Sequence, residues 1–132
     1  MRRPLDDGWS IELPGAWNRD RTRHGVTRWW APGRTMHVKR AGFYCTDALG
    51  IAAWLDSELP PNPSGKVGEG GDNGVGARCA WLYRESGGVH YTLYGYNFRG
   101  CDYLETVFRS ADTPDLAWAF GAWRSVAHGT VR

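Results

Sequence analysis

The sequence predicts an α+β fold, in which a twisted antiparallel β-sheet of about six strands packs against two helices. Apolar and polar residues alternate with a period of two in several short runs, as they do in half-buried strands. Gly and Pro separate these runs, and two further segments repeat their apolar residues with the period of a helix. With 132 residues, the chain is expected to form one domain over 1–132.

The first half should contain three strands and one helix. Residues 9–13 alternate before a proline and predict a strand, whereas the polar residues 18–24 predict a loop. Residues 26–31 and 35–41 flank a Pro-Gly turn and predict a hairpin. A helix is expected over 48–59, after residues that can cap it and before a Pro-Pro pair that ends it.

The second half should repeat this order. Residues 60–76 predict a long loop with a short edge strand at 66–69. Three successive β runs at 77–85, 89–97 and 101–109 are joined by short turns, which predicts an antiparallel meander.

Gly95 and the last segment complete the expected order β-β-β-α-β-β-β-α. A glycine inside the middle strand of the meander indicates a bulge or a close backbone approach. Asp112-Thr113-Pro114 predicts the start of the second helix, and Gly129 its C-cap. The apolar face of this helix should comprise Leu116, Ala119, Phe120, Trp123 and Ala127.

The segment DDGWSIELPGAW resembles the opening of PsbP-like domains, in which an aromatic-x-apolar-x-apolar-Pro strand is followed by a short turn and Trp. The matching residues here are Trp9, Ile11, Leu13, Pro14 and Trp17. The family includes photosystem accessory subunits, a nuclear-transport cofactor, periplasmic DcrB-type proteins and bacterial chaperones for type VI secretion effectors. The resemblance implies a mostly non-enzymatic protein that binds other proteins, and it implies fold more than function because the motif is structural.

The charge is small but uneven. The net charge is +2, yet residues 1–40 hold nine Lys and Arg against four Asp and Glu, and residues 41–132 hold seven against ten. This asymmetry is either a solvated basic end or a patch that steers an acidic partner. Nucleic-acid binding is disfavoured, because the balance is not strongly basic and the meander carries few Lys and Arg.

The sequence contains no recognisable catalytic or metal-binding signature, so neither an enzyme nor a cofactor is expected. It lacks zinc-type spacings, a GxSxG elbow and a phosphate-binding glycine loop. Cys79 shares a strand face with aromatic residues and is expected to be a buried, inert thiol. The start of the chain has no apolar signal segment and no run is long enough for a membrane span, which favours a cytoplasmic protein.

Eight tryptophans are more than a small core is expected to hide. Trp118 points about 200° away from the apolar Leu116 at 100° per residue, and is either roofed by a loop or exposed for a partner. We therefore expect a protein-interaction module, an adaptor or chaperone that holds an apolar segment or acidic surface of a secreted or assembly-related protein. The candidate contact residues are Trp54, Trp118, Tyr94 and Tyr96, and the candidate steering residues are Arg19, Arg21, Arg23 and Arg28.

Two alternatives remain open at this point. The first is a small-ligand-binding or hydrolytic domain that uses His90 with Asp102 or Glu105 as an acid–base pair. Asp102 and Glu105 are three positions apart on one strand, so they should point to opposite faces and cannot act together. The second alternative is a structural subunit of a larger secretion or phage-like assembly.

Overall fold

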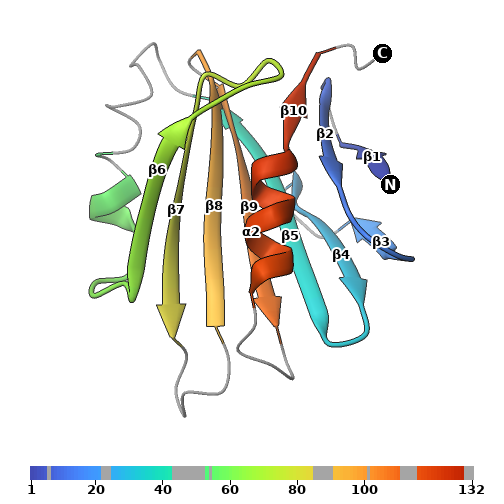
Figure 1. The fold of residues 1–132 in the computed structure, drawn as a ribbon, viewed down its shortest axis with the longest axis horizontal. Helices are drawn as coiled ribbons and strands as arrows, with labels where there is room; N and C mark the ends of the chain where they lie inside the picture. Colours follow the sequence, from blue (N-terminus) through green and yellow to red (C-terminus); the bar gives the residue numbers. More distant parts are fainter. Residues whose placement is uncertain are drawn as a thin grey trace.

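The computed structural model has an α+β fold built on two antiparallel sheets (Figure 1). The larger sheet has seven strands in the order β3-β4-β5-β9-β8-β7-β6, and the smaller has three in the order β1-β2-β10. The structure describes residues 1–5, 7–21, 25–42, 53, 55–84, 91–100, 102–110 and 116–129.

The larger sheet confirms the predicted hairpin, because β4 pairs with β5. It also confirms the predicted meander, in which β7 pairs with β8 and β8 pairs with β9. Its central contact joins the two halves of the chain, where β5 pairs with β9 over nine residues. The bounds are β3 Asn18–Arg21, β4 Thr27–Ala31, β5 Arg34–Gly42, β6 Gly65–Gly70, β7 Ala77–Arg84, β8 Tyr91–Arg99 and β9 Asp102–Ser110.

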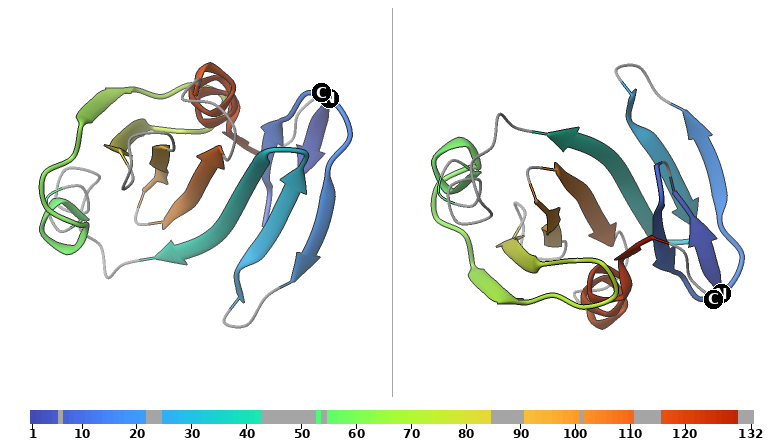
Figure 2. Two further views of the ribbon diagram at one scale, coloured as in Figure 1. Left: turned by 90° about the horizontal axis from the view of Figure 1, so that it is seen from below. Right: turned by 90° about the horizontal axis from the view of Figure 1, so that it is seen from above.

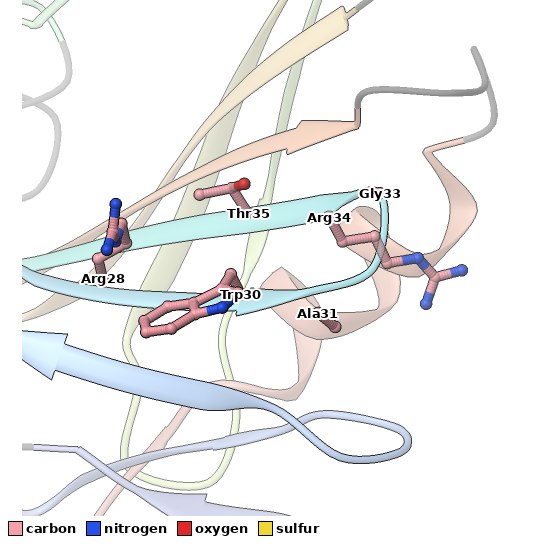
Figure 3. A pocket seen from close by; sticks show the side chains of 6 residues that line it. All are labelled: Arg28, Trp30, Ala31, Gly33, Arg34 and Thr35. Carbon is pink, nitrogen blue, oxygen red and sulfur yellow. The ribbon is translucent and has the colours of Figure 1, made fainter.

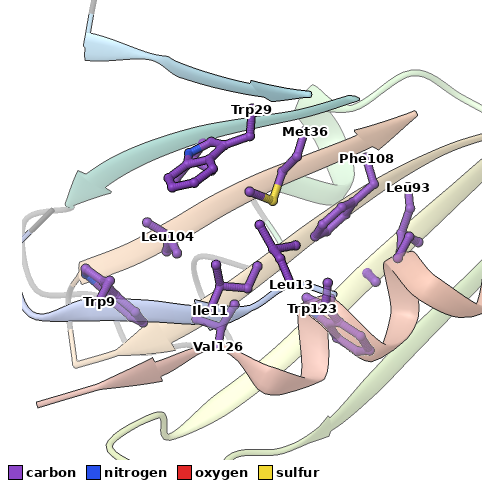
Figure 4. Packing of buried hydrophobic residues seen from close by; sticks show 14 of the residues in the cluster. Trp9, Ile11, Leu13, Trp29, Met36, Leu93, Leu104, Phe108, Trp123 and Val126 are labelled. Carbon is purple, nitrogen blue, oxygen red and sulfur yellow. The ribbon is translucent and has the colours of Figure 1, made fainter. Parts of the chain in front are cut away.

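The smaller sheet and helix α2 (Ala117–Ser125) cover one face of the larger sheet (Figure 2). The smaller sheet consists of β1 (Arg2–Pro4), β2 (Trp9–Glu12) and β10 (Ala127–His128). Between these layers lies the main core, in which apolar side chains are removed from water (Figure 4). Its labelled members are Trp9, Ile11, Leu13, Trp29, Met36, Leu93, Leu104, Phe108, Trp123 and Val126.

A second core lies on the other face of the larger sheet. Residues 55–58 are helical and lie on this side. Leu55 is buried there, and Trp81 Nε1 donates a hydrogen bond to Asp56 Oδ1 at 2.9 Å. The buried members are Leu55, Cys79, Trp81, Tyr96, Phe98 and Tyr103.

The ends of the fold differ from the sequence prediction. Residues 18–21, expected in a loop, form the edge strand β3, although all four are exposed. Helix α2 ends at Ser125, and Ala127 pairs with Ser10 in the smaller sheet instead of extending the helix. The described residues therefore contain ten strands, more than the six expected.

Two other predictions have mixed outcomes. The short edge strand at 66–69 is confirmed as β6. Of the helix expected over 48–59, residues 55–58 are helical, and the Leu59 amide bonds to the Leu55 carbonyl at 2.8 Å. Residues 48–52 and 54 lie outside the described residues, as does the predicted start of the second helix at 112–114.

Gly95 makes the close approach that its place in β8 predicted. The strand register runs through it without interruption, so there is no bulge there. A Cβ at this position would lie 2.6 Å from Cδ1 of Trp123 and 3.0 Å from Oγ1 of Thr106. The absence of a side chain lets Trp123 sit against β8, where its Nε1 donates to the Tyr96 carbonyl at 3.2 Å.

Candidate binding surface

The part of the second face formed by β3, β4, β5 and β9 is the candidate binding surface. Because side chains alternate across a strand, the neighbours of the core residues Trp29 and Met36 point to this side. We call this surface the outer face. Its side chains are Asn18, Asp20, Arg28, Trp30, Thr35, His37, Lys39, Glu105, Val107 and Arg109.

The strand register arranges these side chains in rows across the sheet. The first row places Asp20, Arg28, His37 and Val107 side by side. The second row places Asn18, Trp30, Thr35 and Arg109 side by side. Since directly paired residues have Cβ atoms about 5 Å apart, each row is a set of direct cross-strand neighbours.

Arg28 is held by two neighbours on this surface. Its Nη2 lies 2.8 Å from Oδ2 of Asp20, and its guanidinium carbon lies 4.7 Å from the centroid of the Trp30 ring. A cation over an indole face is attracted by the ring quadrupole, and the ion pair fixes its orientation. With 45% of its side chain exposed, Arg28 still presents donors to solvent.

A hollow of about 410 Å³ adjoins these residues at the β4–β5 hairpin (Figure 3). Arg28 and Thr35 project from the neighbouring strands, the Trp30 ring lies alongside β4, and Arg34 extends away from them. The Arg34 guanidinium carbon lies 4.9 Å from the centroid of the Trp118 ring. The hollow is lined by Arg28, Trp30, Ala31, Gly33, Arg34 and Thr35, none of them acidic.

His37 lies in the middle of the first row. Burial lowers its pKa below the ordinary value, and the positive charges of Arg109 and Arg28 lower it further, against a smaller opposing effect of Asp20. Its Nδ1 is enclosed and has no hydrogen-bond partner among the described residues. The imidazole is therefore neutral near neutral pH, and the proton is best placed on Nε2 because an enclosed N–H without an acceptor is costly.

Trp118 is roofed by packing. Its ring centroid lies 5.8 Å from that of Trp17 and 5.7 Å, edge to face, from that of Phe108, while Arg34 covers it from the hairpin. Its Nε1 is enclosed without a hydrogen-bond partner in the described part of the chain. The ring is thus part of the α2 side of the molecule and adds no area to the outer face.

The two predicted tyrosines lie mostly inside. Tyr96 is 0% exposed, and its hydroxyl donates to Oε2 of Glu105 at 2.7 Å. Burial raises its pKa far above the ordinary value, and the Glu105 charge raises it further. Tyr94 is half-buried, with its ring edge to face against Tyr83 at 5.4 Å.

The predicted arginines are divided between the two faces. The guanidinium carbon of Arg19 lies 5.3 Å from the centroid of the buried Trp29 ring, so Arg19 covers an edge of the main core. Arg21 is exposed on the same side of β3, and of the described arginines in the prediction only Arg28 lies on the outer face. Trp54 and Arg23 lie outside the described residues.

The acid–base alternative on the meander stays a prediction that the described residues do not test. His90 lies outside the described residues. Glu105 is paired across the sheet with Lys39 and Tyr96, whereas Asp102 is paired with Gly42 and Arg99. Within the part of the chain that is described, no three His, Cys, Asp or Glu side chains are grouped to hold a metal ion.

Cys79 is buried, as its neighbours in the sequence predicted. Burial raises the pKa of its thiol to about 12. Since the thiolate is the nucleophilic form, this sulfur is unreactive at neutral pH.

Sequence reasoning missed most of the outer face, including Trp30, Thr35, His37 and Arg109. Their signal lies in the alternation that predicted β4, β5 and β9. The residues between the apolar positions of each run point to the opposite face of the sheet. Once the hairpin register is assumed, these residues place Arg28 opposite His37 and Trp30 opposite Thr35.

The comparisons with known proteins are consistent with this fold and do not assign a function. A crystal structure of a protein from Bacteroides thetaiotaomicron VPI-5482, at 1.50 Å resolution, matches with a TM-score of 0.67 and 12% sequence identity. The match covers 93% of this chain and 46% of that protein, so the chain spans about half its length. At this identity the likeness shows the fold alone. No family model and no curated protein matches the sequence.

The described residues also include no helix that is both long and apolar enough to cross a membrane.

Proposed function

We propose that this chain is a non-catalytic protein-interaction module, an adaptor or chaperone, that docks an acidic segment of another protein on its outer face. The observation that carries the proposal is the hollow at the β4–β5 hairpin, which combines an indole, a partly exposed guanidinium and a hydroxyl and has no acidic lining residue. We also propose a PsbP-like relationship and a cytoplasmic location, both supported by the sequence features alone.

The charges of the outer face favour an acidic occupant. Arg28, Lys39 and Arg109 are all exposed there. The two acidic neighbours are already engaged, because Asp20 pairs with Arg28 and Glu105 accepts the Tyr96 hydroxyl. A segment that carries carboxylates would neutralise the remaining positive charge of the outer face, and electrostatic attraction would speed its association.

Trp30 provides the apolar contact. Its ring is half-buried and lies beneath the Arg28 guanidinium, so its position is fixed before a partner arrives. Trp and Arg are the residue types that most often dominate binding energy at protein interfaces. Preorganisation of this kind reduces the entropy lost on binding.

The proposal is tested by selecting binders from a random decapeptide display library on the folded domain. Peptides enriched on the wild type should carry net negative charge and should bind Trp30→Ala and Arg28→Gln about tenfold or more weakly. Arg124→Gln is a matched control for Arg28→Gln, since Arg124 is similarly exposed, pairs with Glu69 and lies over the Phe120 ring on α2. A selection with no enrichment, or peptides whose binding ignores both outer-face variants, would overturn the proposal.

A further inference from the structure

We propose that Arg28, His37 and Arg109 form an anion site on the outer face that receives one carboxylate group. This inference rests on the proposed function, because it names the group through which the docked acidic segment is held. The site lies next to the hollow and shares Arg28 with it.

The strand register brings the three side chains together. Arg28 on β4 is directly opposite His37 on β5, and His37 is directly opposite Val107 on β9. Arg109 follows Val107 by two residues and therefore points to the same side. Diagonal neighbours of this kind have Cβ atoms about 7–8 Å apart, a gap that an arginine side chain spans easily.

Arg109 supplies the second guanidinium of the site. It is exposed, and it makes no ion pair with any residue that the structure describes. Its direct neighbours across the sheet are Thr35 on β5 and Thr92 on β8, and both carry a hydroxyl. An exposed guanidinium beside a hydroxyl matches the two oxygens of a carboxylate.

His37 completes the site as a neutral donor. With Nδ1 enclosed and without a partner among the described residues, the Nε2–H group is the one left to meet a ligand. A neutral imidazole between two guanidiniums adds a hydrogen bond without adding a third repelling charge.

The net charge of the groups around His37 indicates whether the ligand carries one negative charge or two. Facing His37 are Asp20 on β3, Arg28 on β4, Lys39 on β5, and Glu105 and Arg109 on β9, with the Tyr94 hydroxyl on β8. Three cations against two carboxylates leave a single positive charge among these described groups. A monoanionic carboxylate balances that charge, whereas a dianionic phosphate would exceed it.

The probe for this site is benzoate, which joins a carboxylate to a ring that can contact Trp30. Benzoate is titrated at constant ionic strength against the ring resonances of His37, assigned with His37→Gln, and benzamide serves as the uncharged comparison. The site should bind benzoate with the weak, roughly millimolar affinity of so small a ligand. Benzoate and not benzamide should shift the His37 resonances and raise the pKa of His37, because a nearby negative charge favours the imidazolium.

Two variants complete the experiment. Arg109→Gln should weaken benzoate binding about tenfold or more, whereas Arg99→Gln, an exposed arginine at the far end of β8, should leave it unchanged. Unchanged His37 resonances at saturating benzoate, or equal binding to Arg109→Gln, would overturn the inference. In that case, selected acidic peptides whose binding depends on Trp30 would still support the proposed function. Conversely, benzoate binding in the absence of any selected peptide would overturn the proposed function and support the anion site.

Discussion

The contact between Gly95 and Trp123 makes the sharpest prediction about stability. In Gly95→Ala the new Cβ would start 2.6 Å from Cδ1 of Trp123, closer than real Cβ atoms approach. Trp123 cannot retreat easily, because it is 0% exposed and its Nε1 is bonded to the Tyr96 carbonyl. Overpacking a well-filled core costs about 1–3 kcal/mol. At this chain length, that loss corresponds to a fall in Tm of about 4–11 °C.

The measurement is urea denaturation followed by tryptophan fluorescence and far-UV circular dichroism. Gly68→Ala in β6 and Gly121→Ala in α2 are matched controls, since an added Cβ meets nothing within 4 Å at either position. Alanine reduces the freedom of the unfolded chain, so both controls should be neutral or more stable by about 0.5–1 kcal/mol. A Gly95→Ala protein as stable as wild type would show that the indole does not pack on β8 as described.

Three further predictions concern Arg78, Cys79 and His37. Arg78 is 4% exposed and donates hydrogen bonds to Asp72 and to the Val126 carbonyl. Arg78→Met should lower the free energy of unfolding by about 2–3 kcal/mol, because it removes the donor to that carbonyl. A denaturation midpoint equal to that of wild type would contradict this. Cys79, with its pKa raised to about 12, should remain unmodified by iodoacetamide at pH 8 in the native protein and react after unfolding in urea, as peptide mapping by mass spectrometry will show. Burial lowers the pKa of His37 in the folded state, so the folded state binds this proton less well than the unfolded state, whose pKa is about 6.5. The stability that His37 contributes is therefore full above about pH 6.5 and is lost as the pH falls through the lower pKa of the folded state. Between pH 8 and pH 5, wild type should therefore lose more thermal stability than His37→Gln, and equal losses would rule out the perturbed histidine.

The sequence was informative where local pattern and tertiary role agree. Apolar and aromatic runs separated by short turns predicted β7, β8 and β9, because each of these strands buries one set of side chains in each core. It failed for β3, whose four exposed polar residues carry no apolar period and are held by backbone bonds to β4. It also failed for β10, because its pairing with β2 joins opposite ends of the chain.

The binding surface was predictable only in part. Arg28 was identified from the basic first part of the chain, and it does lie on the outer face. Trp118 is one of the surplus indoles and Tyr96 lies on the meander, but periodicity alone cannot show that Trp17 and Arg34 cover the first or that the second core encloses the other. Trp30 and His37 emerge only when the pairing of β4 with β5 is known.

The most direct measurement is an amide chemical-shift map recorded while a selected acidic peptide is added to the labelled domain. Our account predicts that the largest changes fall on β4 and β5 near Trp30 and His37, and on β9 near Arg109, with little change along α2. Changes concentrated on α2 or on the three-stranded sheet, with the outer face silent, would contradict it.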